Sequence, residues 1–215
     1  MEFLPKKIDD YSCKHTQEES QVLKDLNRET WAKVLIPRML SGHLQGRTLS
    51  MFSKMIKPTN ILEIGTYTGY SAICLCEGMK EEGKLHTIDI NEELKEMSSK
   101  YFKKANVDDK IVQHVGNALK IIPELDLNWD LVFIDADKEN YSNYFDLVID
   151  KMAIGAILIA DNVLWSGKVT DQTISEKDTE TNEIIKFNSK VHQSDRVENV
   201  LMPIRDGLMV CRKVK

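Results

Sequence analysis

The chain has 215 residues, 42% of them hydrophobic, which is enough for one large α/β domain with a core of its own. Its formal net charge of -5 and the absence of a dense Lys/Arg block disfavour a nucleic-acid partner. The longest strongly apolar run, Ala153 to Ala160, is too short to cross a membrane, and the N-terminus lacks the apolar core of a signal peptide, so we expect a cytoplasmic protein with no membrane partner.

Two helices are expected ahead of the first strand, within residues 1–57. Thr16 to Glu19 reads T-x-x-E, a capping-box pattern that begins a helix running to about Leu40. A second apolar stripe, over residues 45–57, predicts another helix, which Pro58 ends. These N-terminal helices would form a cover on one edge of the domain that follows.

From residue 58 onward, short apolar runs alternate with helical patterns. Strands are expected at residues 61–64, 85–90, 111–115, 131–135 and 154–160. Helices are expected at residues 71–81, 92–105, 118–124 and 141–151, and a polar loop over 161–178 precedes a helix at 180–192. Regular alternation of this kind implies a mostly parallel sheet with helices on both faces.

The last two strands, at residues 197–203 and 208–212, are joined by a short Arg205-Asp206-Gly207 turn and are therefore expected to be antiparallel. The sequence thus predicts an α/β fold with a doubly wound, mostly parallel seven-stranded sheet and a C-terminal antiparallel hairpin. Residues 58–215 would form the Rossmann-like core of a single domain spanning residues 1–215. Class I methyltransferases have this architecture, but a fold-level analogy carries no chemistry by itself.

The most informative stretch is ILEIGTYTGYS, residues 61–71. An apolar run containing Glu63 leads into a glycine turn from Gly65 to Gly69, and a helical pattern follows. About twenty residues beyond the turn, a second apolar run ends at Asp89, where a carboxylate would accept hydrogen bonds from both ribose hydroxyls of a nucleotide cofactor. This layout predicts a cofactor pocket on a doubly wound sheet.

The glycine spacing discriminates between cofactors. Dinucleotide sites use G-x-G-x-x-G, whose close glycines bring a helix N-terminus against a pyrophosphate. This chain has G-x-x-x-G, and Thr66, Tyr67 and Thr68 would crowd a pyrophosphate. The wider turn suits S-adenosylmethionine, which carries a sulfonium and no phosphate. A purely structural strand-to-helix turn is the alternative.

Acidic residues stand at the ends of neighbouring predicted strands. In open α/β sheets the carboxyl ends of the strands face the ligand, so Asp135, Asp161 and Asn162 are expected at one edge. Two carboxylates and an amide carbonyl form an all-oxygen set, which Mg²⁺, Mn²⁺ or Ca²⁺ prefers. Three protein ligands leave positions open for water and substrate, as a catalytic metal requires. The alternative is that Asp161-Asn162 only caps a turn.

Lys138 follows Asp135 by three residues in the segment DADKEN. If this segment is helical, the two side chains share one face. An ammonium group beside a dication is repelled, so its pKa falls and it becomes able to act as a base near neutral pH. A solvated surface lysine is the alternative interpretation.

Taken together, these motifs resemble those of the cation-dependent class I O-methyltransferases of the caffeoyl-CoA and catechol type. The resemblance runs from about Met39 to the C-terminus. The matching elements are Met39 with Gln45-Gly46, ILEIGTYTGYS, TIDINEE, GNAL (116–119), DLVFIDADKENYSNYFD (130–146), LIADNVLWSGKV (158–169) and IRDGLMVCRK (204–213). The pair of motifs DADK-x-NY and ADN-x-LW-x-G is highly specific.

The resemblance implies a role for each matching residue. The implied cofactor residues are Met39, Glu63, Gly65, Ser71, Asp89, Ala118 and Asp135. Among them Asp89 would hold the ribose, the Ala118 backbone would contact adenine, and Asp135 would face the cofactor amine. The implied metal ligands are Asp135, Asp161 and Asn162, and Lys138 matches the catalytic base proposed in the catechol branch. Asn117 departs from the family, in which many members carry Asp.

The resemblance also implies a reaction. An S-adenosylmethionine-dependent O-methyltransferase would transfer a methyl group to a hydroxyl of a catechol-like or caffeoyl-type aromatic acceptor, with Mg²⁺ as the expected cation and Mn²⁺ or Ca²⁺ as alternatives. An ortho-diol would chelate the cation, which lowers the hydroxyl pKa and orients the acceptor. Trp165 would flank the aromatic ring or only anchor its loop. A homodimer is implied as well.

Three other functions remain open from the sequence. A nicotinamide-dependent oxidoreductase on the same fold is disfavoured by the G-x-x-x-G spacing. A binding protein of this fold without turnover would show a broken metal set, whereas this set is intact. A nucleic-acid methyltransferase is disfavoured by the acidic charge and by the missing N-P-P-[FY]-type motif.

Overall fold

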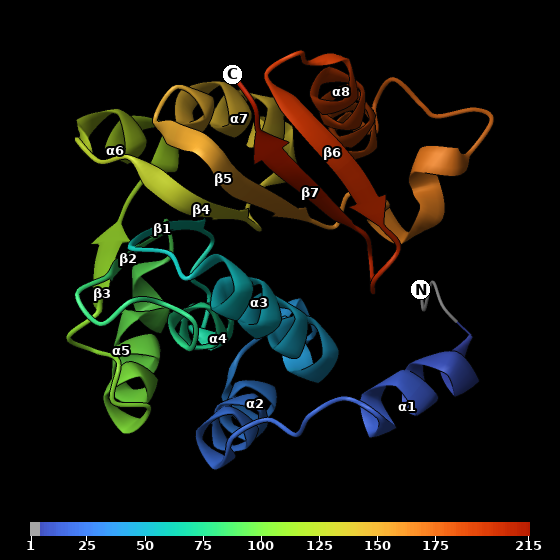
Figure 1. The fold of residues 1–215 in the computed structure, drawn as a ribbon. Helices are drawn as coiled ribbons and strands as arrows, with labels where there is room; N and C mark the ends of the chain where they lie inside the picture. The colour runs from blue at the N-terminus through green and yellow to red at the C-terminus, as the bar shows by residue number, and fades with distance from the viewer. Residues whose placement is uncertain (1–4) are drawn as a thin grey trace.

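The computed structural model describes residues 5–215, and a single sheet runs through their centre (Figure 1). Its seven described strands stand in the order β3-β2-β1-β4-β5-β7-β6. The strands are β1 (Asn60–Ile64), β2 (Lys84–Asp89), β3 (Ile111–Val115), β4 (Trp129–Ile134), β5 (Met152–Asp161), β6 (Val197–Met202) and β7 (Leu208–Lys213). The first five are parallel, and β7 is antiparallel to both of its neighbours. The predicted doubly wound sheet with a terminal hairpin is therefore confirmed.

Helices cover both faces of the sheet, as the alternation predicted (Figure 1). On one face lie α6 (Ala118–Glu124), α7 (Tyr141–Ile149) and α8 (Thr179–Gln193); α3 (Gly42–Ile56), α4 (Tyr70–Cys76) and α5 (Lys95–Lys104) lie on the other. Each face has its own buried cluster. Phe145 and Phe187 pack edge to face in the first, and Leu49 and Phe102 belong to the second. Burial of these apolar side chains on two sides fixes the order of the layers.

The N-terminal segment differs from the prediction. A short helix, α1 (Lys6–Lys14), precedes α2 (Gln21–Lys33), and the capping-box prediction at Thr16 is wrong, because the Thr16 hydroxyl donates back to the Ser12 carbonyl. Ser20 caps α2 instead, and its Oγ accepts from Leu23 N at 3.4 Å. The helix also ends earlier than Leu40, since Pro37 lacks a backbone N–H and disfavours helical geometry in the residue before it.

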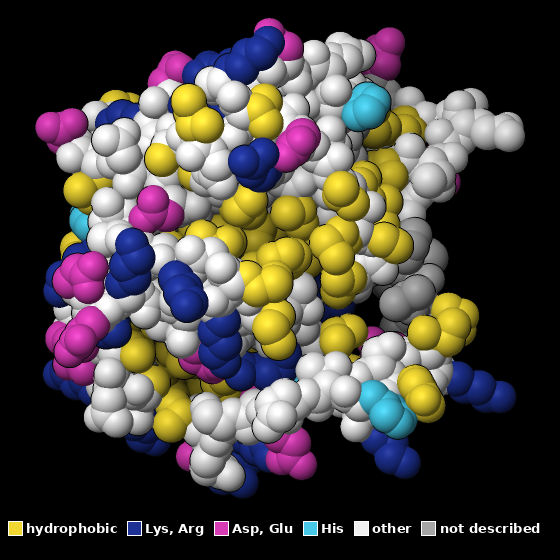
Figure 2. Space-filling view, in the orientation of Figure 1, with side chains coloured by type: hydrophobic (Ala, Val, Ile, Leu, Met, Phe, Trp, Pro, Cys, Tyr) yellow, Lys and Arg dark blue, Asp and Glu magenta, His cyan; other side chains and the backbone are white. Residues whose placement is uncertain are grey.

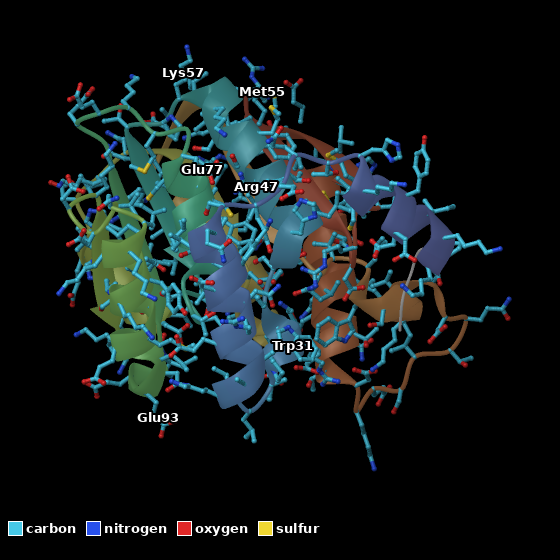
Figure 3. All side chains as sticks on the ribbon, turned by 90° about the horizontal axis from the view of Figure 1, so that it is seen from below. Trp31, Arg47, Met55, Lys57, Glu77 and Glu93 are labelled. Carbon is cyan, nitrogen blue, oxygen red and sulfur yellow. The ribbon has the colours of Figure 1, made fainter. Side chains whose placement is uncertain are left out.

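The link between α3 and α4 is close and polar. The Arg47 guanidinium donates to both Glu77 carboxylate oxygens, at 3.0 and 2.6 Å, and Ser50 and Lys54 donate to the same carboxylate (Figure 3). Helix α4 ends at Cys76 rather than at residue 81, and Gly78 follows it, where an added Cβ would lie 2.1 Å from Lys54 N. This contact fixes α3 against the helix that follows the glycine turn.

Smaller differences concern the loop after β5. The polar segment contains a short 3-10 stretch, η4 (Trp165–Thr170), with Ser166 and Gly167 in left-handed conformations. Two further 3-10 turns, η1 (Pro37–Met39) and η3 (Lys138–Asn140), lie beside the site described below. None of the described helices combines the length and the hydropathy that crossing a membrane demands.

Candidate functional site

The carboxyl ends of the central parallel strands meet at one edge of the sheet, which we call the rim. Asp89 is the last residue of β2, Asp161 is the last residue of β5, and Asp135 directly follows β4. Glu63 lies one residue before the end of β1, which pairs with both β2 and β4. The predicted gathering of acidic side chains at one edge is thus confirmed as geometry.

The glycine turn at the rim is shaped by its protein neighbours. Gly65 has a φ of +106°, and an added Cβ would lie 1.9 Å from the carbonyl oxygen of Asp135. Gly69 has a φ of +90°, and an added Cβ would lie 2.5 Å from the Phe102 ring. Only glycine tolerates both the conformation and the contact. The turn after β1 therefore lies directly against the chain that follows β4.

Asp89 organises the same turn from the next strand. Its Oδ2 accepts a hydrogen bond from Tyr67 N at 2.7 Å, and its Oδ1 accepts one from Asn91 N at 2.8 Å. The side chain is half-buried and lines a small cavity together with Thr66, Lys95 and other residues of β2, β3 and α5. Each carboxylate oxygen has more than one acceptor site, so Asp89 can accept further hydrogen bonds from a ligand.

Glu63 is fully buried beneath the turn. Its Oε2 accepts from the Thr87 hydroxyl at 2.6 Å, and Thr87 in turn contacts the Thr66 hydroxyl. Its Oε1 is buried and has no hydrogen-bond partner among the described residues. Burial raises the pKa of Glu63 to about 8, against the opposing effect of the neighbouring Ser71 and Thr87 hydroxyls; the carboxylates of Asp135 and Asp89 act in the same direction as burial. An unpartnered buried carboxyl oxygen at this place fits a ligand that carries hydrogen-bond donors.

The second half of the rim holds the predicted metal set. Asp161 is 3% exposed; its Oδ2 accepts from Gln45 Nε2 at 2.6 Å and its Oδ1 from Asn162 N at 2.7 Å. Asn162 has a left-handed φ of 59°. Burial and the charge of Asp135 raise the pKa of Asp161 to about 7. Two carboxylates close enough to repel each other are chemically suited to a shared cation.

Among residues 5–215 no group of three or more His, Cys, Asp or Glu side chains is arranged to hold a metal ion. The predicted metal set is not a group of this type, because it contains only two carboxylates and its third member is the amide of Asn162. Oxygen donors of this type fit a hard cation with further ligands from water and acceptor. In the structure the ammonium group of Lys138 balances Asp135, with Nζ 3.3 Å from Oδ1.

Lys138 is not a solvated surface lysine. It begins η3, its residue is 7% exposed, and Nζ donates to the Tyr141 hydroxyl at 2.7 Å. The Tyr141 hydroxyl donates to the Asp161 carbonyl at 3.0 Å, and the Lys138 Nζ lies 5.7 Å from the centre of the Trp165 ring. Because the i, i+3 spacing brings Lys138 back to Asp135, the ammonium group lies inside the rim.

The other predicted cofactor residues come from α4, α6 and η1. Ser71 is 6% exposed in α4, and Ala118 is 7% exposed at the first position of α6. Asn117 caps α6, since its Oδ1 accepts from Leu119 N at 2.8 Å. Met39 is 56% exposed in η1, and the residue before η1, Ile36, accepts from the Tyr67 hydroxyl at 3.0 Å.

Sequence reasoning assigned no role to Gln45, Arg205 or Tyr141, although all three contact this site. Gln45 is 1% exposed and joins Asp161 to Arg205, whose Nη1 lies 3.0 Å from Gln45 Oε1. The signal that marks Gln45 is a polar residue on the apolar face of a helix, but nothing in one sequence says which partner satisfies it.

The comparisons with known proteins agree with this geometry. Residues 13–214 match a family model described as O-methyltransferase. A caffeoyl-CoA O-methyltransferase from Medicago sativa is 34% identical over 211 residues, which cover 92% of this chain and 83% of that protein.

Two solved structures are also similar. An O-methyltransferase from Bacillus cereus in complex with S-adenosylhomocysteine (SAH) superposes with a TM-score of 0.88 at 26% identity, covering 96% of this chain and 97% of the other. The O-methyltransferase TomG from Streptomyces achromogenes, involved in tomaymycin synthesis and solved with S-adenosylmethionine (SAM), gives a TM-score of 0.87 at 27% identity, covering 97% and 96%.

Proposed function

Because this chain belongs to the O-methyltransferase family and is a SAM-dependent O-methyltransferase, we propose that its acceptor is a catechol-like or caffeoyl-type aromatic diol and that a divalent cation assists the reaction. One observation carries the proposal. The glycine turn is in contact with Asp135, so that the cofactor half and the acidic half of the rim form one continuous site.

The cofactor half would bind SAM through groups that still have hydrogen-bonding capacity. Asp89 would accept from the ribose hydroxyls, because its two present partners are backbone N–H groups of the turn. The unpartnered Oε1 of Glu63 and the adjoining hydroxyl of Ser71 would serve the methionine end, together with Met39. The backbone of Ala118, at the start of α6, would contact adenine.

The acidic half would hold the cation. Asp135, Asp161 and Asn162 supply two carboxylates and one amide oxygen, a donor set suited to Mg²⁺, with Mn²⁺ and Ca²⁺ as alternatives. A bound cation would lower the pKa of an acceptor hydroxyl and orient the diol. Asp135 has a second role in this proposal, since it also faces the cofactor side through its carbonyl contact with Gly65.

Lys138 would complete the chemistry. Its Nζ lies between Asp135 and the Tyr141 hydroxyl, and in this proposal Lys138 would take the proton that the acceptor hydroxyl loses. Bound SAM would supply the methyl group to the resulting acceptor oxygen, with cleavage of its carbon–sulfur bond and release of SAH. Fixing the acceptor in line with that bond is the contribution of the rigid rim.

Trp165 would lie against the acceptor ring. It begins η4, just beyond Asp161 and Asn162, and its indole Nε1 is buried with no hydrogen-bond partner among the described residues. An indole ring next to the metal set supplies both an aromatic surface and one donor. The relative from Medicago sativa is named for a CoA-linked caffeoyl acceptor, and this chain would take either that ester or a free catechol.

A homodimer and a cytoplasmic location are part of the proposal. Figure 2 shows apolar side chains gathered on one face. Among the exposed apolar residues, Met51 and Met55 of α3 and Val200 of β6 are each more than half exposed. A second copy would cover such a surface. The four cysteines carry free thiols, as expected in a reducing compartment. Light scattering on the purified chain tests the dimer, because a monomeric mass contradicts it.

The experiment that tests the function is a methyl-transfer assay with SAM and Mg²⁺ over a panel of acceptors. Free catechols, caffeate, caffeoyl-CoA, flavonoids and simple monophenols are compared by product mass. We expect transfer to ortho-diols and a single methylated product. Equal transfer to monophenols contradicts the diol proposal, and the ratio of caffeate to caffeoyl-CoA turnover decides between free and CoA-linked acceptors.

A further inference from the structure

The side chain of Gln45 joins three parts of the chain that are far apart in sequence. It comes from the first turn of α3, its partner Asp161 ends β5, and its other partner Arg205 lies in the turn between β6 and β7. Gln45 is 1% exposed and Asp161 is 3% exposed, so this contact is shielded from water. A buried contact between such distant segments is costly unless every polar atom in it is satisfied.

The hydrogen bonds decide which way the Gln45 amide faces. Arg205 only donates, and its Nη1 lies 3.0 Å from Oε1 of Gln45, so that oxygen must face the guanidinium. The amide nitrogen is then turned toward Asp161, and its distance to Oδ2 is 2.6 Å. Arg205 thereby fixes Gln45, and Gln45 fixes one oxygen of Asp161.

The opposite oxygen of Asp161 is fixed as well. Its Oδ1 accepts from Asn162 N at 2.7 Å. With a donor on each oxygen, rotation of the carboxylate about its last bond would break at least one hydrogen bond. The same Nη1 of Arg205 also faces the carbonyls of Leu40, at 3.3 Å, and Ser41, directly before α3, so its two hydrogens are shared among these carbonyls and Gln45. The chain of contacts begins and ends on backbone, which makes it rigid.

We propose that Gln45 is a positioning residue that sets the orientation of the Asp161 carboxylate for cation binding, and that Arg205 sets the orientation of Gln45. This inference rests on the proposed cation site. Groups that orient a metal ligand through a hydrogen bond usually contribute about 10- to 100-fold to metal affinity. In this proposal Gln45 acts on the cation through Asp161, its hydrogen-bond partner.

The test is an equilibrium titration of the full chain with Mn²⁺, without SAM or acceptor. The concentration of free Mn²⁺ is measured at each step by electron paramagnetic resonance. Gln45→Met removes the donor and the acceptor and keeps an unbranched side chain. We expect it to weaken Mn²⁺ binding by about tenfold or more. SAH affinity measured by calorimetry in chelator should stay within about twofold, because in the described part of the chain Gln45 makes no hydrogen bond to Glu63, Ser71 or Asp89 and acts on Asp161 instead.

Ser53→Ala is the matched control. Ser53 is also buried in α3, and its hydroxyl donates to Leu75 O at 2.5 Å, away from the rim. It should lower the melting temperature without changing Mn²⁺ affinity. Arg205→Met removes the hydrogen bond between Arg205 and Gln45 and leaves Gln45 in place. It provides a second test if Gln45→Met fails to fold. It should also weaken Mn²⁺ binding, and Arg205→Lys, which still donates, should restore part of the affinity.

The outcomes separate this inference from the function on which it rests. A wild-type chain that binds Mn²⁺, combined with Gln45→Met or Arg205→Met variants of unchanged affinity, overturns the positioning role alone. Equal losses of affinity in Gln45→Met and Ser53→Ala also overturn it, since they reflect general destabilisation. A wild-type chain that binds no Mn²⁺ removes the cation site and the positioning role together.

Discussion

Gly65 and Asp135 approach so closely that a Cβ on Gly65 would lie 1.9 Å from the Asp135 carbonyl oxygen. They lie just past the ends of β1 and β4, which are neighbours in the sheet. The contact places the glycine turn of the cofactor half against the first residue of the acidic half. Any shift of the glycine turn after β1 must therefore also move the segment that follows β4.

Replacing Gly65 by Ala should damage both halves of the site. The added Cβ overlaps backbone that has no freedom to yield, and the φ of +106° is strained for Ala. Gly155→Ala is a matched control, because its φ is +86° but the nearest atom to an added Cβ is 4.0 Å away. We expect SAM affinity, measured by calorimetry, to fall at least about tenfold in Gly65→Ala and to stay near wild type in Gly155→Ala. Similar affinities in both variants would mean that the contact is unimportant.

Asp89→Ala should weaken SAM binding strongly. The change removes the proposed anionic acceptor of two ribose hydroxyls, at roughly 1.5–3 kcal/mol for each contact. It also removes the acceptor of the Tyr67 and Asn91 backbone N–H groups. Asp130→Ala is the control: Asp130 also accepts from two backbone N–H groups, those of Thr59 and Asn60, at the start of β1. Calorimetry should show lost affinity only in the Asp89 variant. Unchanged affinity in a folded Asp89→Ala protein would remove Asp89 from the pocket.

The Glu77 carboxylate should make stability depend on pH in the acid range. Burial alone would raise its pKa, but hydrogen bonds from Arg47, Ser50 and Lys54 outweigh it and hold the pKa at about 2. The stabilisation is complete above the unfolded-state pKa of about 4.5 and is lost as the pH falls toward 2.

Urea unfolding of Glu77→Gln tests this expectation. The variant should be less stable than wild type by about 1–3 kcal/mol at neutral pH, and the difference should shrink near pH 3. Glu198→Gln, which breaks an exposed pair with Arg212, should change stability by less than about 1 kcal/mol at either pH. If the difference in unfolding free energy between Glu77→Gln and wild type does not change with pH, the charge of Glu77 is not what stabilises the protein.

Lys138→Ala should lower kcat by roughly 10²–10⁴ if Lys138 is the base. Its Nζ lies 3.3 Å from Asp135, a proposed cation ligand, and this carboxylate favours the charged ammonium, so the base role depends on a cation that occupies Asp135. The rate of the variant on a catechol should recover at high pH, where the diol ionises without help. Lys168→Ala, on the exposed side of η4, serves as the control. A flat pH–rate profile close to that of the wild type would leave Lys138 without a catalytic role.

Much of the fold follows from local sequence patterns. The alternation of apolar runs and helical stripes predicted the sheet, and the acidic residues at strand ends predicted the rim, because parallel strands must end on one side. The boundaries were less predictable. Thr16 and Ser20 both offer a capping hydroxyl, but the Thr16 hydroxyl donates to the Ser12 carbonyl at the end of α1 and the Ser20 hydroxyl caps α2.

Local sequence patterns could not predict the contacts that orient the side chains of the site. Gln45 and Asp161 are separated by 116 positions, and Gln45 and Arg205 by 160, so no spacing rule links them. Gly65 illustrates the same limit: the motif marks the glycine, but only the structure shows that an added Cβ would meet the Asp135 carbonyl, 70 positions further along the chain. Motifs identify the residues of a site, but the contacts that hold those residues in place can be identified only from the folded structure.

The cation dependence of methyl transfer tests the central claim most directly. The measurement is the rate of transfer from SAM to a catechol in EDTA, followed by the rate after Mg²⁺ or Mn²⁺ is added back. We expect chelation to abolish turnover and the cation to restore it, and we expect Asp161→Ala and Asn162→Ala to impair the restored rate more than they impair SAM binding. Full activity in EDTA, with both variants unaffected, would contradict the proposed role of Asp135, Asp161 and Asn162.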